Sequence, residues 1–316
     1  MNYSNLKKSK IKKAFSMIEI SIVILIIGLL IAGIAKATDM IADSKLKTAR
    51  SVTKASPVNR LSNLVLWIET TMNESWKDQY RYDGAQASRN IFDVNPQIIP
   101  PESFAFTVPS GATITYKADA YNSLPSIKLS AEYSTSSARS SSRVFDIQAS
   151  GFTIFAVVKP QKTAAQEIIR FEQATATDNN KINLKYTGGT TGSVFHKGTL
   201  IYPSKTTGAS PSDSEATVIA SAVSTIPNQQ IEVLTAQADG TKGVIFSNGT
   251  ATSLSTSVPF TPRSNIDGFF KIGADIEIFE LIVVGERVND SVRKNVEQYL
   301  FKKWGIPTDK LVAGAF

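Results

Sequence analysis

The sequence feature that most limits the fold is an apolar run near the N-terminus. From Phe15 to Ala35 the chain carries a single charged residue, Glu19. As an α-helix this run would span roughly 30 Å, which matches the hydrocarbon core of a bilayer. A carboxylate inside a membrane segment is costly, by about 2.5–3.5 kcal/mol near the bilayer centre. Glu19 is therefore a functional candidate that needs a partner.

A short basic segment, residues 1–14, precedes the apolar run and contains no acidic residue. Its basic residues are Lys7, Lys8, Lys10, Lys12 and Lys13. Without these five lysines, the formal net charge of +7 falls to +2. The basic balance thus belongs to a targeting segment, and we expect no nucleic-acid partner.

The junction of the two segments reads Ala14-Phe15-Ser16-Met17-Ile18-Glu19. With its flanks, residues 7–56, it resembles the N-terminus of a type IV prepilin or pseudopilin, although Ala14 stands where that family usually has Gly. The resemblance implies that a prepilin peptidase cleaves between Ala14 and Phe15. It also implies methylation of the new Phe15 amine and a role for Glu19 in assembly with other pilin subunits.

The same resemblance implies a location. The prepilin would cross the inner membrane once, with its N-terminus in the cytoplasm, and would then enter an extracellular pilus or a periplasmic pseudopilus. Two alternatives stay open. An ordinary secretory signal could be cleaved after Ala35-Lys36-Ala37, but the apolar run exceeds the usual length of about 7–15 residues, and such a signal has no use for Glu19. A plain signal anchor is the other.

Helical periodicity continues beyond the apolar run. Ala49 and Val52 fall on one apolar face, and Pro57 disfavours further helix. We therefore expect a transmembrane and spine helix over residues 15–56 and a globular domain over residues 57–316.

The chain after Pro57 is typical of antiparallel β-structure followed by a short helix. Short β-branched and aromatic runs alternate with Gly, Pro, Asn and Ser, and Asp239-Gly240 predicts a hairpin turn. A helix is predicted to begin at one of three N-cap candidates, Asn289, Asp290 and Ser291, and to end before Gly305. The predicted strands are 64–68, 113–116, 127–130, 152–158, 167–171, 182–186, 231–236, 244–247 and 276–284. The predicted fold class is α+β, without disulfides because cysteine is absent.

Four of these stretches together resemble a laminin-G-like, concanavalin A-like domain. They are 64–69, 152–159, 276–284 and the terminal Val296-Glu-Gln-Tyr-Leu-Phe-Lys-Lys-Trp-Gly305. The resemblance implies a two-sheet jelly-roll β-sandwich that binds a carbohydrate or a surface protein. The Ser-rich stretch 134–142 and the stretch 206–215 are predicted to be exposed loops.

Catalytic chemistry has one candidate in this part of the chain. Asp275-Ile-Glu277-Ile-Phe-Glu280 is similar to the carboxylate strand of some jelly-roll glycoside hydrolases, in which paired carboxylates lie about 5–5.5 Å apart. The first two acids are exchanged relative to that pattern, so we expect no catalytic role. His196, the single histidine, is expected in a surface turn.

Metal binding rests on weaker sequence evidence. Calcium is the possible cofactor, with Asp178, Asn180 and Asp239 as candidate ligands, but no complete loop signature surrounds them.

The sequence thus predicts a pilin-like filament subunit, minor or at the tip, that displays a carbohydrate- or surface-binding domain and is not an enzyme. The alternatives are a membrane-tethered polysaccharide hydrolase and a plain secreted binding module.

Overall fold

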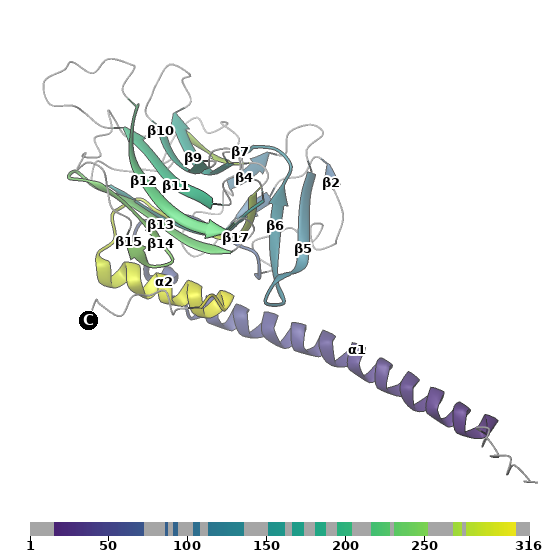
Figure 1. Ribbon diagram of the computed structural model, residues 1–316. Helices are drawn as coiled ribbons and strands as arrows, with labels where there is room; N and C mark the ends of the chain where they lie inside the picture. The colour runs from purple at the N-terminus through teal and green to yellow at the C-terminus, as the bar shows by residue number, and fades with distance from the viewer. Residues whose placement is uncertain are drawn as a thin grey trace, which may run out of the picture. The chain divides into compact units, whose positions relative to one another are not determined.

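The computed structural model describes residues 16–72, 86–87, 91–93, 104–107, 113–135, 151–161, 166–173, 181–187, 195–203, 216–227, 231–251, 268–273 and 276–307 (Figure 1). The chain divides into two compact units, Met1–Lys45 and Leu46–Phe316. The boundary falls inside a helix, whereas the sequence places the start of the globular domain at Pro57.

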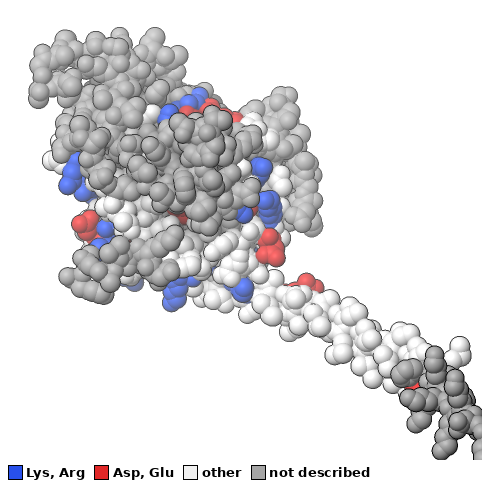
Figure 2. Space-filling view, viewed as in Figure 1, with Lys and Arg blue, Asp and Glu red and all other residues white. Residues whose placement is uncertain are grey.

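The N-terminal helix α1 runs over 38 residues, Met17–Lys54. Its large apolar side chains from Met17 to Ile41 are exposed, and Figure 2 shows this part as a largely white surface. It is the single described helix that is long and apolar enough to cross a membrane. The structure therefore contains a helix that can act as a membrane anchor or as a signal sequence.

The last turns of α1 belong to the globular unit, where Ala49 and Thr53 are buried. Arg50 Nε donates to the Thr71 carbonyl at 2.7 Å. Beyond the helix end, the Asn59 side chain donates to the Lys54 carbonyl at 3.0 Å and so caps the terminus. The predicted apolar face at Ala49 is confirmed.

Strands of the globular unit form two sheets, and every described pair is antiparallel (Figure 1). The nine-stranded sheet has the order β15 (Thr250–Ala251), β14 (Gly243–Ser247), β13 (Glu232–Ala238), β8 (Phe152–Pro160), β17 (Ile276–Val284), β6 (Leu124–Leu129), β5 (Thr113–Tyr121) and β2 (Gln86–Ala87), with β1 (Leu64–Glu69) also on β17. Because β6 pairs with the start of β17 and β1 with its end, both share one edge of that strand.

The eight-stranded sheet has the order β12 (Ala216–Pro227), β11 (Phe195–Pro203), β10 (Lys181–Thr187), β9 (Gln166–Gln173), β16 (Gly268–Ile272), β7 (Tyr133–Thr135), β4 (Phe104–Thr107) and β3 (Ile91–Asp93). The main apolar core lies between the two sheets. It joins residues such as Ile154 and Leu234 of the first sheet to Phe171 and Leu184 of the second.

A second apolar cluster covers the outer face of the nine-stranded sheet. It joins the helix α2 (Asp290–Trp304), Ala49 of α1 and Val58 of the short helix η1 (Pro57–Arg60) to strand residues such as Phe155. Of the three predicted N-cap candidates, the structure uses Asn289, whose side chain accepts from the Val292 N–H. The predicted C-terminal glycine, Gly305, is confirmed, with φ +65°.

All nine predicted strands are present, and so is the hairpin turn at Asp239. Eight further strands were not predicted from the sequence: β2, β3, β4, β7, β11, β12, β15 and β16. The prediction of a turn at His196 is wrong, since this residue lies in β11 opposite Ile226. The predicted loop 134–142 begins within β7, and its remainder lies outside the described residues, as does 206–215.

Candidate functional site

The described N-terminus of α1 is closed by a reciprocal cap. Ser16 Oγ accepts from the Ile18 N–H at 3.3 Å, and Glu19 Oε2 accepts from the Ser16 N–H at 2.8 Å. This is a capping box, and the Ser-x-x-Glu spacing is the sequence signal that would have predicted it. Ala14 and Phe15, the predicted cleavage and methylation positions, lie outside the described residues. Glu19 thus has a local role in helix initiation besides any role in assembly.

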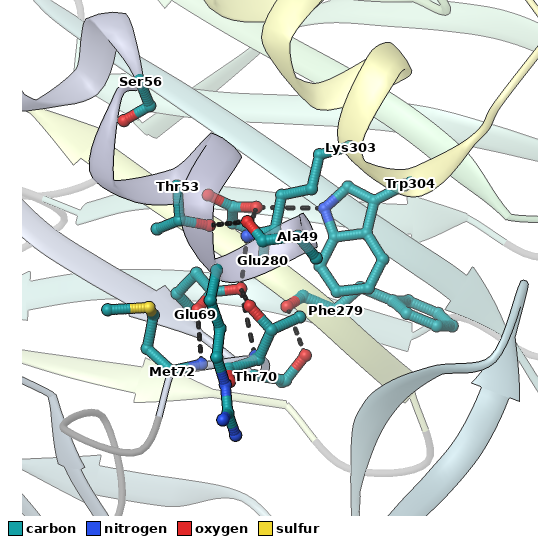
Figure 3. A network of polar contacts seen from close by, with 12 residues as sticks. Ala49, Thr53, Ser56, Glu69, Thr70, Met72, Phe279, Glu280, Lys303 and Trp304 are labelled. Atoms are coloured by element: carbon teal, nitrogen blue, oxygen red, sulfur yellow. Dashed lines mark hydrogen bonds and ion pairs between the residues drawn. The ribbon is translucent and has the colours of Figure 1, made fainter. Parts of the chain in front are cut away.

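A cluster of ionisable side chains is buried beneath α2, and we call it the carboxylate–lysine network (Figure 3). It consists of Glu69 from β1, Glu280 from β17 and Lys303 from α2. Lys303 Nζ lies 2.8 Å from Glu280 Oε2 and also contacts Glu69 Oε1. The Lys303 and Glu280 side chains are both 0% exposed.

A β-bulge brings Glu280 to this side of the sheet. Ile278 and Leu281 both face the core between the sheets, although strict alternation would point them to opposite faces. The pairing of β17 with β8 shifts register between Ile278 and Glu280. The extra residue moves Glu280 to the helix-covered face beside Phe279.

Glu280 accepts hydrogen bonds from aromatic side chains as well as from Lys303. Trp67 Nε1 donates to Oε1 at 2.9 Å and Tyr299 OH at 2.7 Å, while Trp304 Nε1 donates to Oε2 at 3.0 Å. Tyr299 OH also lies 3.4 Å from Thr53 Oγ1 of α1. Both oxygens of this buried carboxylate are therefore satisfied by directed donors.

Glu69 is held by the chain that follows it. Its Oε1 accepts from the Thr71 N–H at 3.0 Å and from Thr71 Oγ1 at 2.7 Å, and Oε2 accepts from the Met72 N–H at 2.7 Å. Because Arg50 donates to the Thr71 carbonyl, this turn also holds the end of α1. The carboxylate–lysine network thus connects β1, β17, α2 and the last turns of α1.

Two carboxylates and one ammonium group share this buried space. Burial raises the pKa of the Glu280 carboxyl above its ordinary 4.5, against the opposing effect of Lys303, and the nearby Glu69 raises it further. Burial and Glu280 together raise the pKa of Tyr299 well above its ordinary value, so its hydroxyl stays a donor. With its side chains closed off from solvent, this arrangement anchors helices and offers no access to a substrate.

Glu277, the other acid predicted on this strand, has a separate set of partners. Ser126 Oγ donates to Oε1 at 2.5 Å, Gln161 Nε2 donates to Oε2 at 2.8 Å, and Lys117 Nζ lies 3.3 Å from Oε2. Glu277 and Glu280 therefore do not form a carboxylate pair around a shared cleft. Asp275 lies outside the described residues.

The structure describes one of the three calcium-ligand candidates, Asp239. Asp178 and Asn180 lie outside the described residues. Asp239 Oδ1 accepts from the N–H groups of Thr241 and Lys242 at 2.7 and 2.9 Å, and Oδ2 contacts Arg287. Partial burial acts to raise the pKa of Asp239, but these donors outweigh it and lower the pKa to about 2. Asp239 thus serves as a turn cap, and no metal-type cluster of acids and histidine occurs within the described ranges.

Comparisons with known proteins give no family. No family model matches the sequence, and no curated protein matches it. Among solved structures, Trypanosoma rangeli sialidase in complex with sialic acid has a TM-score of 0.43 at 13% identity, covering 81% of this chain and 38% of that one. The same sialidase with a difluoro-KDN ligand has a TM-score of 0.39 at 13% identity, covering 76% and 33%.

A smaller domain among the solved structures has a similarly low TM-score and identity. The Ruminococcus gnavus IT-sialidase CBM40 bound to α2,3 sialyllactose has a TM-score of 0.35 at 12% identity, covering 46% of this chain and 82% of that one. This chain spans about a third of the length of the Trypanosoma enzyme. At such low TM-scores, the likeness supports no conclusion about the fold family, reaction or ligand of this chain.

Proposed function

We propose that this chain is a type IV pilin-like filament subunit, minor or at the tip, that displays a laminin-G-like, concanavalin-type β-sandwich outside the cell. The observation that carries the proposal is α1 itself. Its apolar residues from Met17 to Ile34 are exposed, and Glu19 is the single charge among them. An exposed apolar helix needs a lipid or protein environment, and a filament of such helices supplies one after the membrane.

Glu19 gains a second partner in such a filament. Once the leader is removed, the Phe15 amine of a neighbouring subunit offers a positive charge for the Glu19 carboxylate. Pairing the two offsets the cost of burying each charge alone. The proposed partners are therefore a prepilin peptidase, the inner membrane and other pilin subunits, followed by an extracellular glycan or surface protein.

Two features of the globular unit favour a binding or structural role over catalysis. Glu277 and Glu280 are both buried, and their oxygens already accept protein hydrogen bonds. A glycoside hydrolase needs its two carboxyl groups open to the glycosidic bond. The membrane-tethered hydrolase thus lacks a described site, and we propose that the protein is not an enzyme.

The first prediction concerns the mature N-terminus. We expect cleavage between Ala14 and Phe15, with a methyl group on the Phe15 amine. Intact-mass and N-terminal peptide mass spectrometry of the protein from its native membrane measures both. A chain that starts at Thr38, as after an ordinary secretory signal, or one that keeps its leader would contradict the proposal.

The second prediction separates the two roles of Glu19. In Glu19→Gln the amide oxygen can still accept from the Ser16 N–H, but the charge is lost. A neighbouring amine buried without its counter-charge costs about 3–5 kcal/mol. We therefore expect filament incorporation of Glu19→Gln and of Glu19→Ala to fall by at least about a hundredfold, with membrane insertion unchanged. Quantitative immunoblotting of sheared filaments and membranes measures both quantities.

The matched control is Ser16→Ala, which removes the hydroxyl from the cap and keeps the Glu19 charge. We expect this variant to assemble almost normally. If Glu19→Gln assembles like the wild type while Ser16→Ala and Glu19→Ala do not, helix capping is the function of Glu19 and the charge pairing is wrong.

A further inference from the structure

The amine of Lys303 lies between two carboxylates inside the carboxylate–lysine network (Figure 3). Its Nζ lies 2.8 Å from Glu280 Oε2 and also contacts Glu69 Oε1. The carboxyl carbon of Glu69, Cδ, is one bond beyond that oxygen. The fold therefore holds a nucleophile beside an acyl carbon, and such fixed proximity lowers the barrier to a reaction between them.

The groups around this amine exclude water. The side chains of Lys303 and Glu280 are 0% exposed, and that of Glu69 is 3% exposed. Lys303 Nζ also lies 5.0 Å from the ring centroid of Trp304 and 5.5 Å from that of Tyr299. A closed site of this kind makes ionised groups costly to keep and excludes the water that would hydrolyse an amide.

The two carboxylates have different hydrogen-bond partners, which suit them to different roles. Glu69 Oε2 accepts from the Met72 N–H at 2.7 Å, and this donor can stabilise negative charge that develops on the oxygen. Glu280 is held by two indole N–H groups and a tyrosine hydroxyl. Burial raises the pKa of Glu280, so its carboxyl holds a proton at higher pH than an ordinary glutamate. Glu69 thus has the features of an acyl group and Glu280 those of a proton carrier.

We propose that Lys303 and Glu69 join in an intramolecular amide, an isopeptide bond, with Glu280 as the catalytic residue that transfers the protons. Glu280 first moves one proton from the Lys303 ammonium to Glu69 Oε1, which leaves a neutral amine and a neutral carboxyl group. The Nζ lone pair then forms a bond to Glu69 Cδ, and negative charge gathers on Oε2 beside the Met72 N–H.

The bond is completed by loss of water. A second proton passes from the nitrogen through Glu280 to Glu69 Oε1. The bond between Cδ and Oε1 breaks, and one water molecule leaves. An ammonium and a carboxylate thus become one neutral amide and one water, without an oxidant or an activating group. Glu280 ends the reaction as it began.

The bond ties the beginning of the globular unit to its end. Glu69 is the last residue of β1, and Lys303 lies in the last turn of α2, 234 residues later. A covalent link there closes the intervening chain into a loop and restricts its unfolded state, as a disulfide does in other proteins. The ion pairs described above are the state before the bond forms, so a linked chain loses more stability in Lys303→Met than the ion pairs alone account for. The inference goes beyond the proposed function, because the bond forms whether or not the chain enters a filament.

Peptide mass spectrometry of the full chain tests the proposal. Protein purified in detergent from its native membrane is unfolded and digested with trypsin, which does not cleave after an acylated lysine. We expect a branched peptide in which 61–77 is joined to 303–310, lighter than the sum of the two by one water molecule. Fragmentation of this peptide should locate the bond at Glu69. Recovery of 61–77 in unlinked form alone, or a bond from Lys303 to Glu280, would overturn the proposal.

The matched control is Lys303→Arg, which keeps a positive charge between the carboxylates but has no amine to acylate. Far-ultraviolet circular dichroism checks its fold, and we expect no branched peptide. Glu280→Gln keeps the size of the side chain but cannot carry protons, so pulse-chase labelling should show the branched peptide forming roughly a hundredfold more slowly. Formation at the wild-type rate in Glu280→Gln would contradict the proton-transfer role. The wild-type peptide decides the existence of the bond even if a variant does not fold.

Discussion

Replacing Lys303 by Met is expected to lower the free energy of unfolding of the globular unit by about 3–5 kcal/mol. The lysine side chain is 0% exposed and contacts both Glu69 and Glu280. Met has a similar length but no charge, so two carboxylates would stay buried without a cation. Trp67 and Trp304 both donate to Glu280, so tryptophan fluorescence during denaturant unfolding of the full chain in detergent reports on this network directly.

The cost of Lys303→Met should depend on pH. Burial raises the folded-state pKa of Glu280 above the ordinary value of 4.5, which applies to the unfolded state. At pH values between the two pKa values, the folded state therefore binds more protons than the unfolded state. The contribution of Glu280 to the free energy of unfolding is therefore fully present below pH 4.5 and is lost as pH rises through the folded-state pKa. Without Lys303 this pKa rises further, because the opposing charge is gone. The difference in the free energy of unfolding between Lys303→Met and the wild type should be largest near neutral pH and should become smaller toward pH 4.5.

Glu280→Gln in the Lys303→Met background provides the control. It removes one of the two unpaired charges and keeps oxygen and nitrogen atoms near the same positions, so we expect it to recover part of the lost stability. A Lys303→Met protein that unfolds within about 1 kcal/mol of the wild type at neutral pH would mean that the network is already neutral or reached by water.

Trp304→Ala is expected to destabilise the globular unit by about 3–5 kcal/mol. The indole is fully buried, and it packs edge-to-face on Phe279 with the ring centroids 5.2 Å apart. Its truncation leaves a cavity beneath the C-terminal turn of α2 and removes a donor from Glu280 Oε2. Denaturant unfolding followed by far-ultraviolet circular dichroism measures the change without relying on the deleted fluorophore.

Trp304→Phe separates packing from hydrogen bonding. It keeps most of the ring and loses the Nε1 donor, so we expect a smaller cost than for Trp304→Ala. If both variants lower the free energy of unfolding equally, the hydrogen bond to Glu280, and not the ring volume, determines the stability at this position.

Much of the local secondary structure could be predicted from the amino-acid sequence. The helix over residues 15–56 was predicted from hydropathy and from Pro57, and the observed α1 covers Met17–Lys54. For α2, Gly305 was predicted correctly and the N-cap was limited to three adjacent residues, of which Asn289 is the one used. Both predictions were possible because capping depends on residues within one turn of the helix end. By contrast, the outer strands β11 and β12 were missed, since Lys197, Gly198 and an Ala- and Ser-rich stretch weaken the local β-signal.

The candidate site was predicted less well, for a definite reason. Glu69, Glu280 and Lys303 all lie in stretches that the laminin-G-like resemblance selected, but the sequence did not indicate that they meet. The contact between Glu69 and Lys303 joins positions 234 residues apart in the chain. Local patterns contain no information on such distant pairs.

By itself the sequence determined the long apolar helix with its single charge at Glu19, the succession of strands after Pro57, and the capped terminal helix. Each of these depends on neighbours within a few residues, where periodicity and capping chemistry act directly. Only the tertiary structure decided what the acids on β17 do. The bulge beside Phe279 reverses the strand's alternation, so Glu280 is enclosed with Lys303 under α2, and Glu277 pairs separately with Lys117. A one-residue change of pleat, set by pairing with β8, moved Glu280 from the side of the strand that faces the core between the sheets to the helix-covered side.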